Sequence, residues 1–196
     1  MSAALKWPPG TGLAGLRMTA DEYLALGETQ ERYELLDGVV FMSPSPMPPH
    51  LEIAIEVLGQ FRDFNKQAKR CRVLAEGDLR LTPGLVYRPD IVVYRPGRLP
   101  TGRLQRLDLP PDLIIEILSP STKPYDLITK RGDYGQFGVG EYWVIDPDDA
   151  SLRCWNRSGG GWNEIPVQGD ALPSTAIAGF VLEMPPLRQI ARGEQP

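Results

Sequence analysis

The sequence predicts an α/β fold in which one mixed β-sheet is flanked by helices. Residues 113–118 and 142–145 are apolar on both faces, which is typical of central strands. A helical segment, residues 125–137, joins them through short links, and such a strand–helix–strand crossover makes the two strands parallel. Asp37 and Gly38 separate two further short apolar runs, a pattern that favours a β-hairpin.

The N-terminal half is expected to begin with a disordered arm, residues 1–16, rich in Ala, Gly and Pro. Thr19 and Glu22 form a capping-box pattern that opens a short helix to residue 26. The hairpin strands follow at 33–36 and 39–42. After a proline loop, a long helix is predicted from about residue 48 to 69. Its expected buried stripe consists of Leu51, Ala54, Ile55, Leu58 and Phe61.

Further strand patterns follow at 72–75, 78–81 and 90–94. Two runs joined around three consecutive glycines, 152–156 and 162–165, predict a C-terminal hairpin. We therefore expect one domain over residues 17–190, followed by a flexible tail, 191–196.

Length and composition limit the class of protein. The chain has 196 residues, of which 42% are hydrophobic and 23% charged, enough to bury a core without disulfides or metal. No apolar run is long enough to cross a membrane, and the N-terminus lacks a secretory signal, so a cytoplasmic protein is expected. The net charge of −4 argues against a surface coated in positive charge. Cys71 and Cys154 are predicted to be buried structural thiols.

Three charged residues stand where the fold alone favours apolar ones. Asp90 opens a strand on the face of Val92, and Glu116 interrupts the apolar run 113–118. Lys130 lies in the middle of the inward helical stripe that includes Tyr134. Buried charges persist when they pair with each other or hold a metal, so the three residues together predict a site.

Each residue also has an ordinary structural interpretation. Asp90 could be a turn residue at the start of a strand, and Glu116 and Lys130 could form a buried ion pair. Lys130 could also extend its charged end to the surface. Chemistry favours a joint role, because two carboxylates suit Mg²⁺, and a neighbouring lysine can orient the attacking water in phosphodiester hydrolysis.

The chain resembles the bacterial restriction-endonuclease-like family of the PD-(D/E)xK nuclease superfamily. The matching pieces run in order from about residue 19 to 156: residues 33–38, 88–93, 113–122, Asp126 with Lys130, and 141–147. The resemblance implies a restriction-endonuclease-like core and a metal-dependent nuclease site, with Asp90 and Glu116 as metal ligands. The superfamily pattern places lysine two residues after the acid, where this chain has Leu118, and the resemblance assigns that role to Lys130.

Further residues are predicted around this site. The resemblance offers Glu34 as an additional acid, whereas a solvent-facing hairpin position is the alternative. His50 is expected to be a surface or capping residue, or to contact the metal ligands. Lys123 competes with Lys130 but lies in a loop, which favours a solvated side chain. Four arginines between the two acidic strands are expected to bind DNA phosphates: Arg95, Arg98, Arg103 and Arg106.

The sequence thus predicts a Mg²⁺-dependent DNA endonuclease, with Mn²⁺ able to substitute. DNA is the expected partner and a homodimer is expected, because two-fold pairing suits a duplex cutter. The sequence contains no glycine-rich phosphate-binding loop, so no nucleotide cofactor is expected. The alternatives are an inactive nuclease scaffold that binds nucleic acid or protein, and a hydrolase of another phosphate ester.

Overall fold

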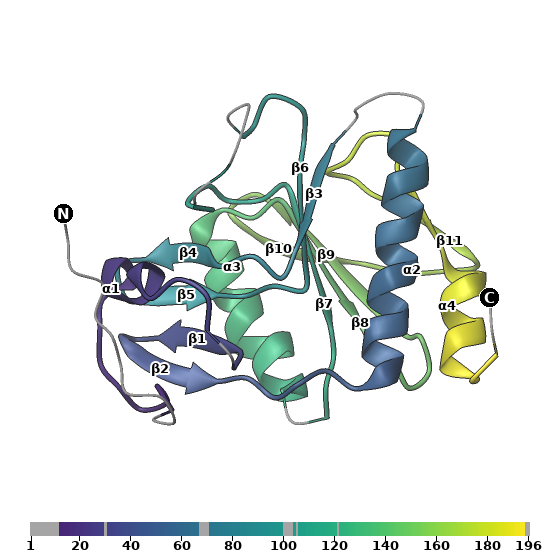
Figure 1. Cartoon of the computed structure of the whole chain (residues 1–196). Helices are drawn as coiled ribbons and strands as arrows, with labels where there is room; N and C mark the ends of the chain where they lie inside the picture. The colour runs from purple at the N-terminus through teal and green to yellow at the C-terminus, as the bar shows by residue number, and fades with distance from the viewer. Residues whose placement is uncertain are drawn as a thin grey trace. The chain divides into compact units, whose positions relative to one another are not determined.

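The computed structural model describes residues 12–29, 31–66, 71–99, 104, 106–120 and 122–194. The chain forms two compact units, both drawn in Figure 1. Unit 1 comprises Met1–Ser45, Asp78–Arg88 and Leu104–Leu109. Unit 2 comprises Pro46–Gly77, Pro89–Arg103 and Pro110–Pro196. The segment predicted as one domain, residues 17–190, is therefore divided between two units.

Unit 1 consists of a short helix and a four-stranded antiparallel sheet. Helix α1, Ala20–Ala25, begins at Thr19, whose hydroxyl and backbone form the predicted capping box with Glu22. The strand order is β2 (Val39–Met42), β1 (Tyr33–Leu36), β5 (Leu85–Tyr87) and β4 (Leu79–Thr82). The predicted hairpin is confirmed: Asp37 and Gly38 have φ angles of 49° and 74°, as the tight turn requires.

Part of the predicted N-terminal arm belongs to this unit. Residues 1–11 lie outside the described residues, but Leu13 is buried in the apolar core of unit 1. Its backbone N–H donates a hydrogen bond to the hydroxyl of Tyr33, at 3.2 Å. The last residues of the arm are thus packed against the fold.

Unit 2 contains a six-stranded mixed sheet. The strand order is β10 (Gly161–Ile165), β9 (Leu152–Ser158), β8 (Glu141–Ile145), β7 (Leu113–Ile117), β6 (Ile91–Tyr94) and β3 (Arg72–Ala75). Strands β7 and β8 pair in parallel, and the other pairs are antiparallel. The predicted crossover is confirmed as η1, a π-helical segment over Tyr125–Lys130, continued by α3, Arg131–Phe137.

Helices cover both faces of this sheet. Helices α2 (Pro48–Asn65) and α4 (Met184–Ala191) share an apolar core with alternate sheet residues such as Ile115 and Trp143. On the opposite face, α3 packs Tyr134 edge-on against Tyr142, with ring centroids 5.2 Å apart. A small two-stranded sheet, β11 (Ala171–Pro173) with β12 (Val181–Glu183), completes the unit. The alternation of strand side chains therefore sends even-numbered residues of β7 and β8 toward η1 and α3.

Two predictions about packing were wrong. The strands form three sheets in the described chain rather than one, because apolar alternation marks a strand but not its partner. The expected stripe on α2 is also rotated: His50, Ile53, Val57 and Phe61 are buried, whereas Leu51 and Ile55 are 45% and 69% exposed. Apolar residues occur around most of this helix, so periodicity did not decide which face meets the sheet.

Several smaller expectations can also be compared with the structure. Both cysteines are buried and free, as predicted. Helix α2 ends at Asn65, and the expected final residues 67–69 lie outside the described part. In the predicted tail, Arg192 forms an ion pair with Glu194 at 2.9 Å, and residues 195–196 are outside the description. No helix in the described ranges combines the length and apolar character needed to cross a membrane.

Candidate active site

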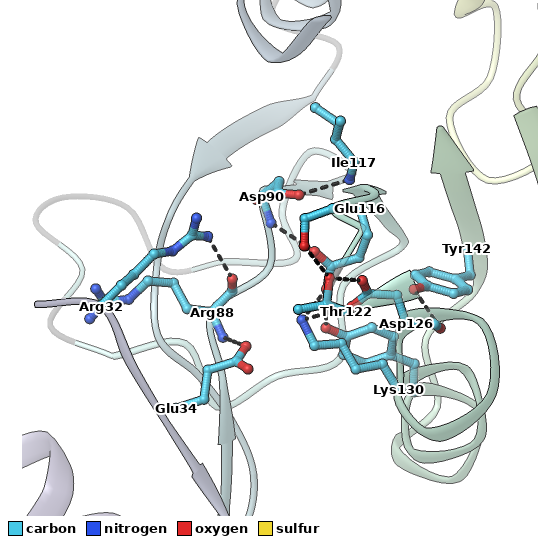
Figure 2. A network of polar contacts seen from close by, with 12 residues as sticks. Arg32, Glu34, Arg88, Asp90, Glu116, Ile117, Thr122, Asp126, Lys130 and Tyr142 are labelled. Carbon is cyan, nitrogen blue, oxygen red and sulfur yellow. Dashed lines mark hydrogen bonds and ion pairs between the residues drawn. The ribbon is translucent and has the colours of Figure 1, made fainter. Parts of the chain in front are cut away.

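Two carboxylates meet at the ends of adjacent strands in unit 2. The antiparallel register pairs Ile91 with Ile115, so Asp90, one residue earlier, lies opposite Glu116. The Asp90 backbone N–H donates to Glu116 Oε2 at 3.2 Å, and the Ile117 N–H donates to Asp90 Oδ2 at 2.8 Å. Asp90 is 6% exposed and Glu116 is 3% exposed. The strand pairing thus holds two buried carboxylates together, as Figure 2 shows.

The crossover brings a lysine to these acids. Lys130 Nζ lies 3.1 Å from Glu116 Oε1 and 3.3 Å from Asp126 Oδ1. The hydroxyl of Tyr134 donates to the same Glu116 oxygen at 2.7 Å. Lys130 is 6% exposed, so its predicted inward position is confirmed. Glu116 Oε1 therefore accepts contacts from both the Lys130 ammonium and the Tyr134 hydroxyl.

Asp126 is a member of this cluster that the sequence reasoning did not assign to the site. Its side chain is buried, and Thr122 Oγ1 donates to its Oδ2 at 2.7 Å (Figure 2). Burial raises the pKa of Asp126, the charge of Lys130 opposes that shift, and the charge of Asp90 adds to it. An acid four residues before an inward lysine on one helix is a usable sequence signal.

The cluster contains more negative than positive charge. Among the described residues, the carboxyl groups of Asp90, Glu116 and Asp126 outnumber the ammonium of Lys130, which contacts Glu116 and Asp126. Tyr142 donates its hydroxyl to the Asp126 carbonyl at 3.1 Å. Burial, followed by the charges of Glu116 and Asp126, raises the pKa of Tyr142 well above its ordinary value. Tyr142 therefore stays a neutral donor at physiological pH and adds no further charge.

The lone histidine contacts one of the acids. His50 lies in the first turn of α2, and its Nε2 is 3.2 Å from Asp90 Oδ2. The side chain is buried, which rules out the expected surface position and agrees with the alternative of a contact to the predicted metal ligands. Its Nδ1 is also buried and has no hydrogen-bond partner among the described residues.

Glu34 belongs to unit 1, on strand β1. It is 7% exposed, so the alternative of a solvent-facing hairpin residue is wrong. Its Oε1 accepts a hydrogen bond from the backbone N–H of Arg88 at 2.9 Å, and Arg32 donates to the Arg88 carbonyl at 3.3 Å. A buried acid therefore anchors the end of strand β5 within this unit.

The predicted phosphate-binding arginines have partners within the protein. Arg95 and Arg98 both pair with Asp112, with nitrogen–oxygen distances of 2.8 and 3.6 Å. Arg106 pairs with Asp21 in unit 1 at 2.8 Å. Arg103 lies outside the described residues, and a role for all four in DNA binding stays a prediction.

The alternative lysine is engaged elsewhere. Lys123 Nζ lies 2.6 Å from Asp146 Oδ2, and its side chain is 51% exposed. The structure thus gives Lys123 an acidic partner of its own, on the solvent-exposed side of the chain. Lys130, by contrast, is buried with Glu116 and Asp126.

The donor set is suited to a hard divalent cation. Within the described ranges, no group of three or more His, Cys, Asp and Glu side chains is arranged to enclose a metal. Mg²⁺ does not need such a cage, because it commonly uses one or two carboxylates, several waters and substrate phosphate oxygens. Asp90 and Glu116 are two neighbouring buried carboxylates, the oxygen donors that this ion prefers. The residues present therefore fit Mg²⁺.

Comparison with known proteins identifies the family and the fold of the chain. Residues 20–185 match the model of the Uma2 family, described as "Putative restriction endonuclease". A crystal structure from Anabaena variabilis, described as a "putative nuclease belonging to DUF820", superposes with a TM-score of 0.75. The two chains are 22% identical, and the match covers 89% of this chain and 99% of that one. No curated protein matches the sequence. The predicted restriction-endonuclease-like fold is thus confirmed, and the chain belongs to the Uma2 family of restriction-endonuclease-like proteins.

Proposed function

We propose that the protein is a Mg²⁺-dependent DNA endonuclease whose site is formed by Asp90, Glu116 and Lys130. The observation that carries this proposal is the group of buried carboxylates that lies beside Lys130, within the described residues, near the ends of β6 and β7. Desolvation makes uncompensated buried charge costly, so such a cluster favours binding of a cation. Membership of the Uma2 family supports nuclease chemistry for this site.

Asp90 and Glu116 are the proposed metal ligands. When bound, Mg²⁺ supplies a Lewis acid that lowers the pKa of a water molecule and offsets charge on the phosphodiester. Asp90 is oriented by the N–H of Ile117 and by His50, and Glu116 by the N–H of Asp90 and by Tyr134. These contacts fix both carboxylates before substrate arrives, which lowers the reorganisation needed during the reaction.

Lys130 is proposed to act on the reacting groups. Its ammonium group contacts Glu116 and Asp126, and these two carboxyl groups hold it beside the carboxylate cluster. From that position it orients the attacking water and stabilises the negative charge that develops on the phosphoryl oxygens. Asp126 is proposed as a positioning residue, because its Oδ1 contacts Lys130 Nζ at 3.3 Å while its Oδ2 accepts a hydrogen bond from Thr122.

Two further residues, His50 and Glu34, were also predicted near the site. His50 is proposed to position Asp90, since its Nε2 reaches the carboxylate that we assign to the metal. A role for Glu34, which is buried in unit 1, stays a prediction from the family resemblance. The competing function is an inert scaffold in which Glu116 and Lys130 form a structural ion pair, as their 3.1 Å separation also permits.

Cleavage of supercoiled plasmid with and without Mg²⁺ tests the proposal. Glu116→Gln keeps the side-chain shape but removes the charge, and we expect cleavage to fall by about 100-fold or more, as when other preorganised catalytic groups are removed. Glu141→Gln is the matched control. Glu141 is a fully buried carboxylate on β8 that accepts hydrogen bonds from Ser174 and Ala176, so its loss should lower stability but spare cleavage.

Metal binding separates the nuclease from the inert scaffold. Calorimetric titration with Mn²⁺ should show saturable binding to the parent and none to Asp90→Asn, with matching circular dichroism. The titration is repeated with duplex DNA, because phosphate oxygens can complete the site. Parent protein that binds no Mn²⁺ in either titration, and cuts neither DNA, RNA nor a small phosphodiester, would establish the scaffold instead.

A further inference from the structure

The sheet face that carries Glu116 continues into a surface of arginine and tryptophan. Pairing across β7, β8 and β9 places Glu116, Val144 and Arg153 in one row. Pairing in the next row places Tyr142 beside Trp155, and the β9–β10 hairpin pairs Arg157 with Trp162. We call the following residues the Arg–Trp surface: Arg131, Arg153, Trp155, Arg157 and Trp162.

Two guanidinium groups lie over one indole of this surface. Arg131 Cζ is 5.0 Å and Arg153 Cζ is 4.7 Å from the centre of the Trp155 ring. Trp155 is 2% exposed, so its ring serves as a fixed support for both cations. Stacking on an aromatic face orients a guanidinium while its edge keeps N–H donors available to a ligand.

The helix on this face is shaped to hold the second tryptophan. Trp162 Nε1 donates to the backbone carbonyl of Arg131 at 2.7 Å. A Cβ atom at Gly135 would lie 2.6 Å from the same Nε1, so only glycine leaves room for the indole there. Gly135 therefore lets the Trp162 indole approach the helix, and the hydrogen bond from this indole holds the backbone of Arg131 at the start of α3, directly after Lys130.

The charges of this surface are incompletely neutralised by the protein. Arg153 forms a two-point ion pair with Glu164, at 2.8 and 3.0 Å. Arg131 and Arg157 form no direct ion pair among the described residues, although the charge of Arg131 contributes to lowering the pKa of Glu164. Arg95 and Arg98, by contrast, share Asp112. An overall acidic protein therefore keeps two available arginines on the sheet face that carries Glu116.

We propose that the Arg–Trp surface binds the sugar–phosphate backbone of the DNA strand that enters the site, an inference that rests on the proposed nuclease function. Arginine recognises phosphate through paired, charge-assisted hydrogen bonds. Two strand spacings separate Arg153 from Glu116, roughly 10 Å. At about 3.4 Å of rise per nucleotide, that span corresponds to some three nucleotides. The surface thus holds phosphates a few nucleotides from the scissile bond.

Fluorescence anisotropy with a labelled DNA duplex in EDTA tests the surface without cleavage. Arg131→Gln and Arg157→Gln should each weaken binding about tenfold, as expected for loss of a charge-assisted contact. Each should also reduce the slope of log affinity against log salt by about 1. Arg192→Gln is the control, because it removes the same charge at the end of α4, the helix packed on the opposite sheet face, and should leave binding unchanged.

Unchanged DNA affinity in both variants would overturn the inference, and so would an equal loss of DNA affinity in Arg192→Gln. A polyglutamate peptide that competes with the labelled duplex as well as unlabelled DNA does would also overturn it, because it would indicate an acidic protein partner. Arg157 is exposed, so its substitution separates a binding defect from misfolding, and circular dichroism checks both variants. Arginine-dependent binding without any cleavage would refute the proposed function alone. Metal-dependent cleavage with parent-like affinity in both arginine variants would refute only the surface.

Discussion

Replacement of Lys130 by methionine tests whether the buried cluster is electrostatically coupled. Methionine keeps an unbranched apolar side chain of similar length, so the change removes the ammonium and leaves little cavity. Glu116 and Asp126 then lose the cation that lies 3.1 and 3.3 Å from their oxygens. Removing one partner of a buried ion pair costs about 3–5 kcal/mol, because the remaining charge is left uncompensated. We expect a loss of this size in the free energy of unfolding at neutral pH.

The loss should depend on pH. Burial raises the pKa of Asp126 above its ordinary value of 3.8, and Lys130 opposes that shift. In Lys130→Met the opposition disappears, so the folded state binds the Asp126 proton still more tightly than the unfolded state does. The stability associated with this proton is complete below the unfolded pKa and is lost as pH rises through the folded one. The variant should therefore approach parental stability in mild acid and fall furthest below it at neutral pH.

Urea unfolding in mild acid and at neutral pH, monitored by circular dichroism, measures the change in the free energy of unfolding. Lys123→Met is the matched control, because Lys123 pairs with Asp146 in a half-exposed position and its removal should change stability little. Combining Lys130→Met with Glu116→Gln should recover part of the loss, since both charges are then removed. A Lys130→Met protein as stable as the parent at neutral pH, or a loss independent of pH and of Glu116, would refute the coupling.

Other predictions concern packing and assembly. Gly140→Ala should destabilise the protein by about 1–3 kcal/mol in urea unfolding, because the new Cβ would lie 2.7 Å from the backbone oxygen of Asp112, and parental stability would contradict this contact. Lys130→Met should retain saturable Mn²⁺ binding in calorimetry, since Lys130 is proposed to act on water and phosphate, and loss of that binding would change the assignment. Light scattering should give twice the chain mass of 21.8 kDa if the predicted homodimer forms, and a single chain mass would exclude it.

Local patterns in the sequence were sufficient to predict most strands and the inward positions of three charged residues of the candidate site. Side chains alternate along a strand, so Asp90 and Glu116 appear as charged breaks in apolar runs without any knowledge of the sheet. Helical periodicity likewise predicts that Lys130 points inward with Tyr134, as the structure confirms. Each of these signals depends on neighbours within a few residues.

The remaining features depend on contacts between distant segments. His50 is buried because its Nε2 meets Asp90, 40 positions later in the chain, and no local pattern indicates that partner. The exposed position of Ile55 follows from which face of α2 packs on the sheet, a choice that the apolar residues on more than one face of this helix leave open. Arg131 on helix α3 and Trp155 on strand β9 are brought together by the packing of this helix on the sheet, which sequence spacing does not encode. The sequence by itself determined the charged strand positions, whereas tertiary packing decided which groups surround them, because pairing and burial are properties of the whole chain.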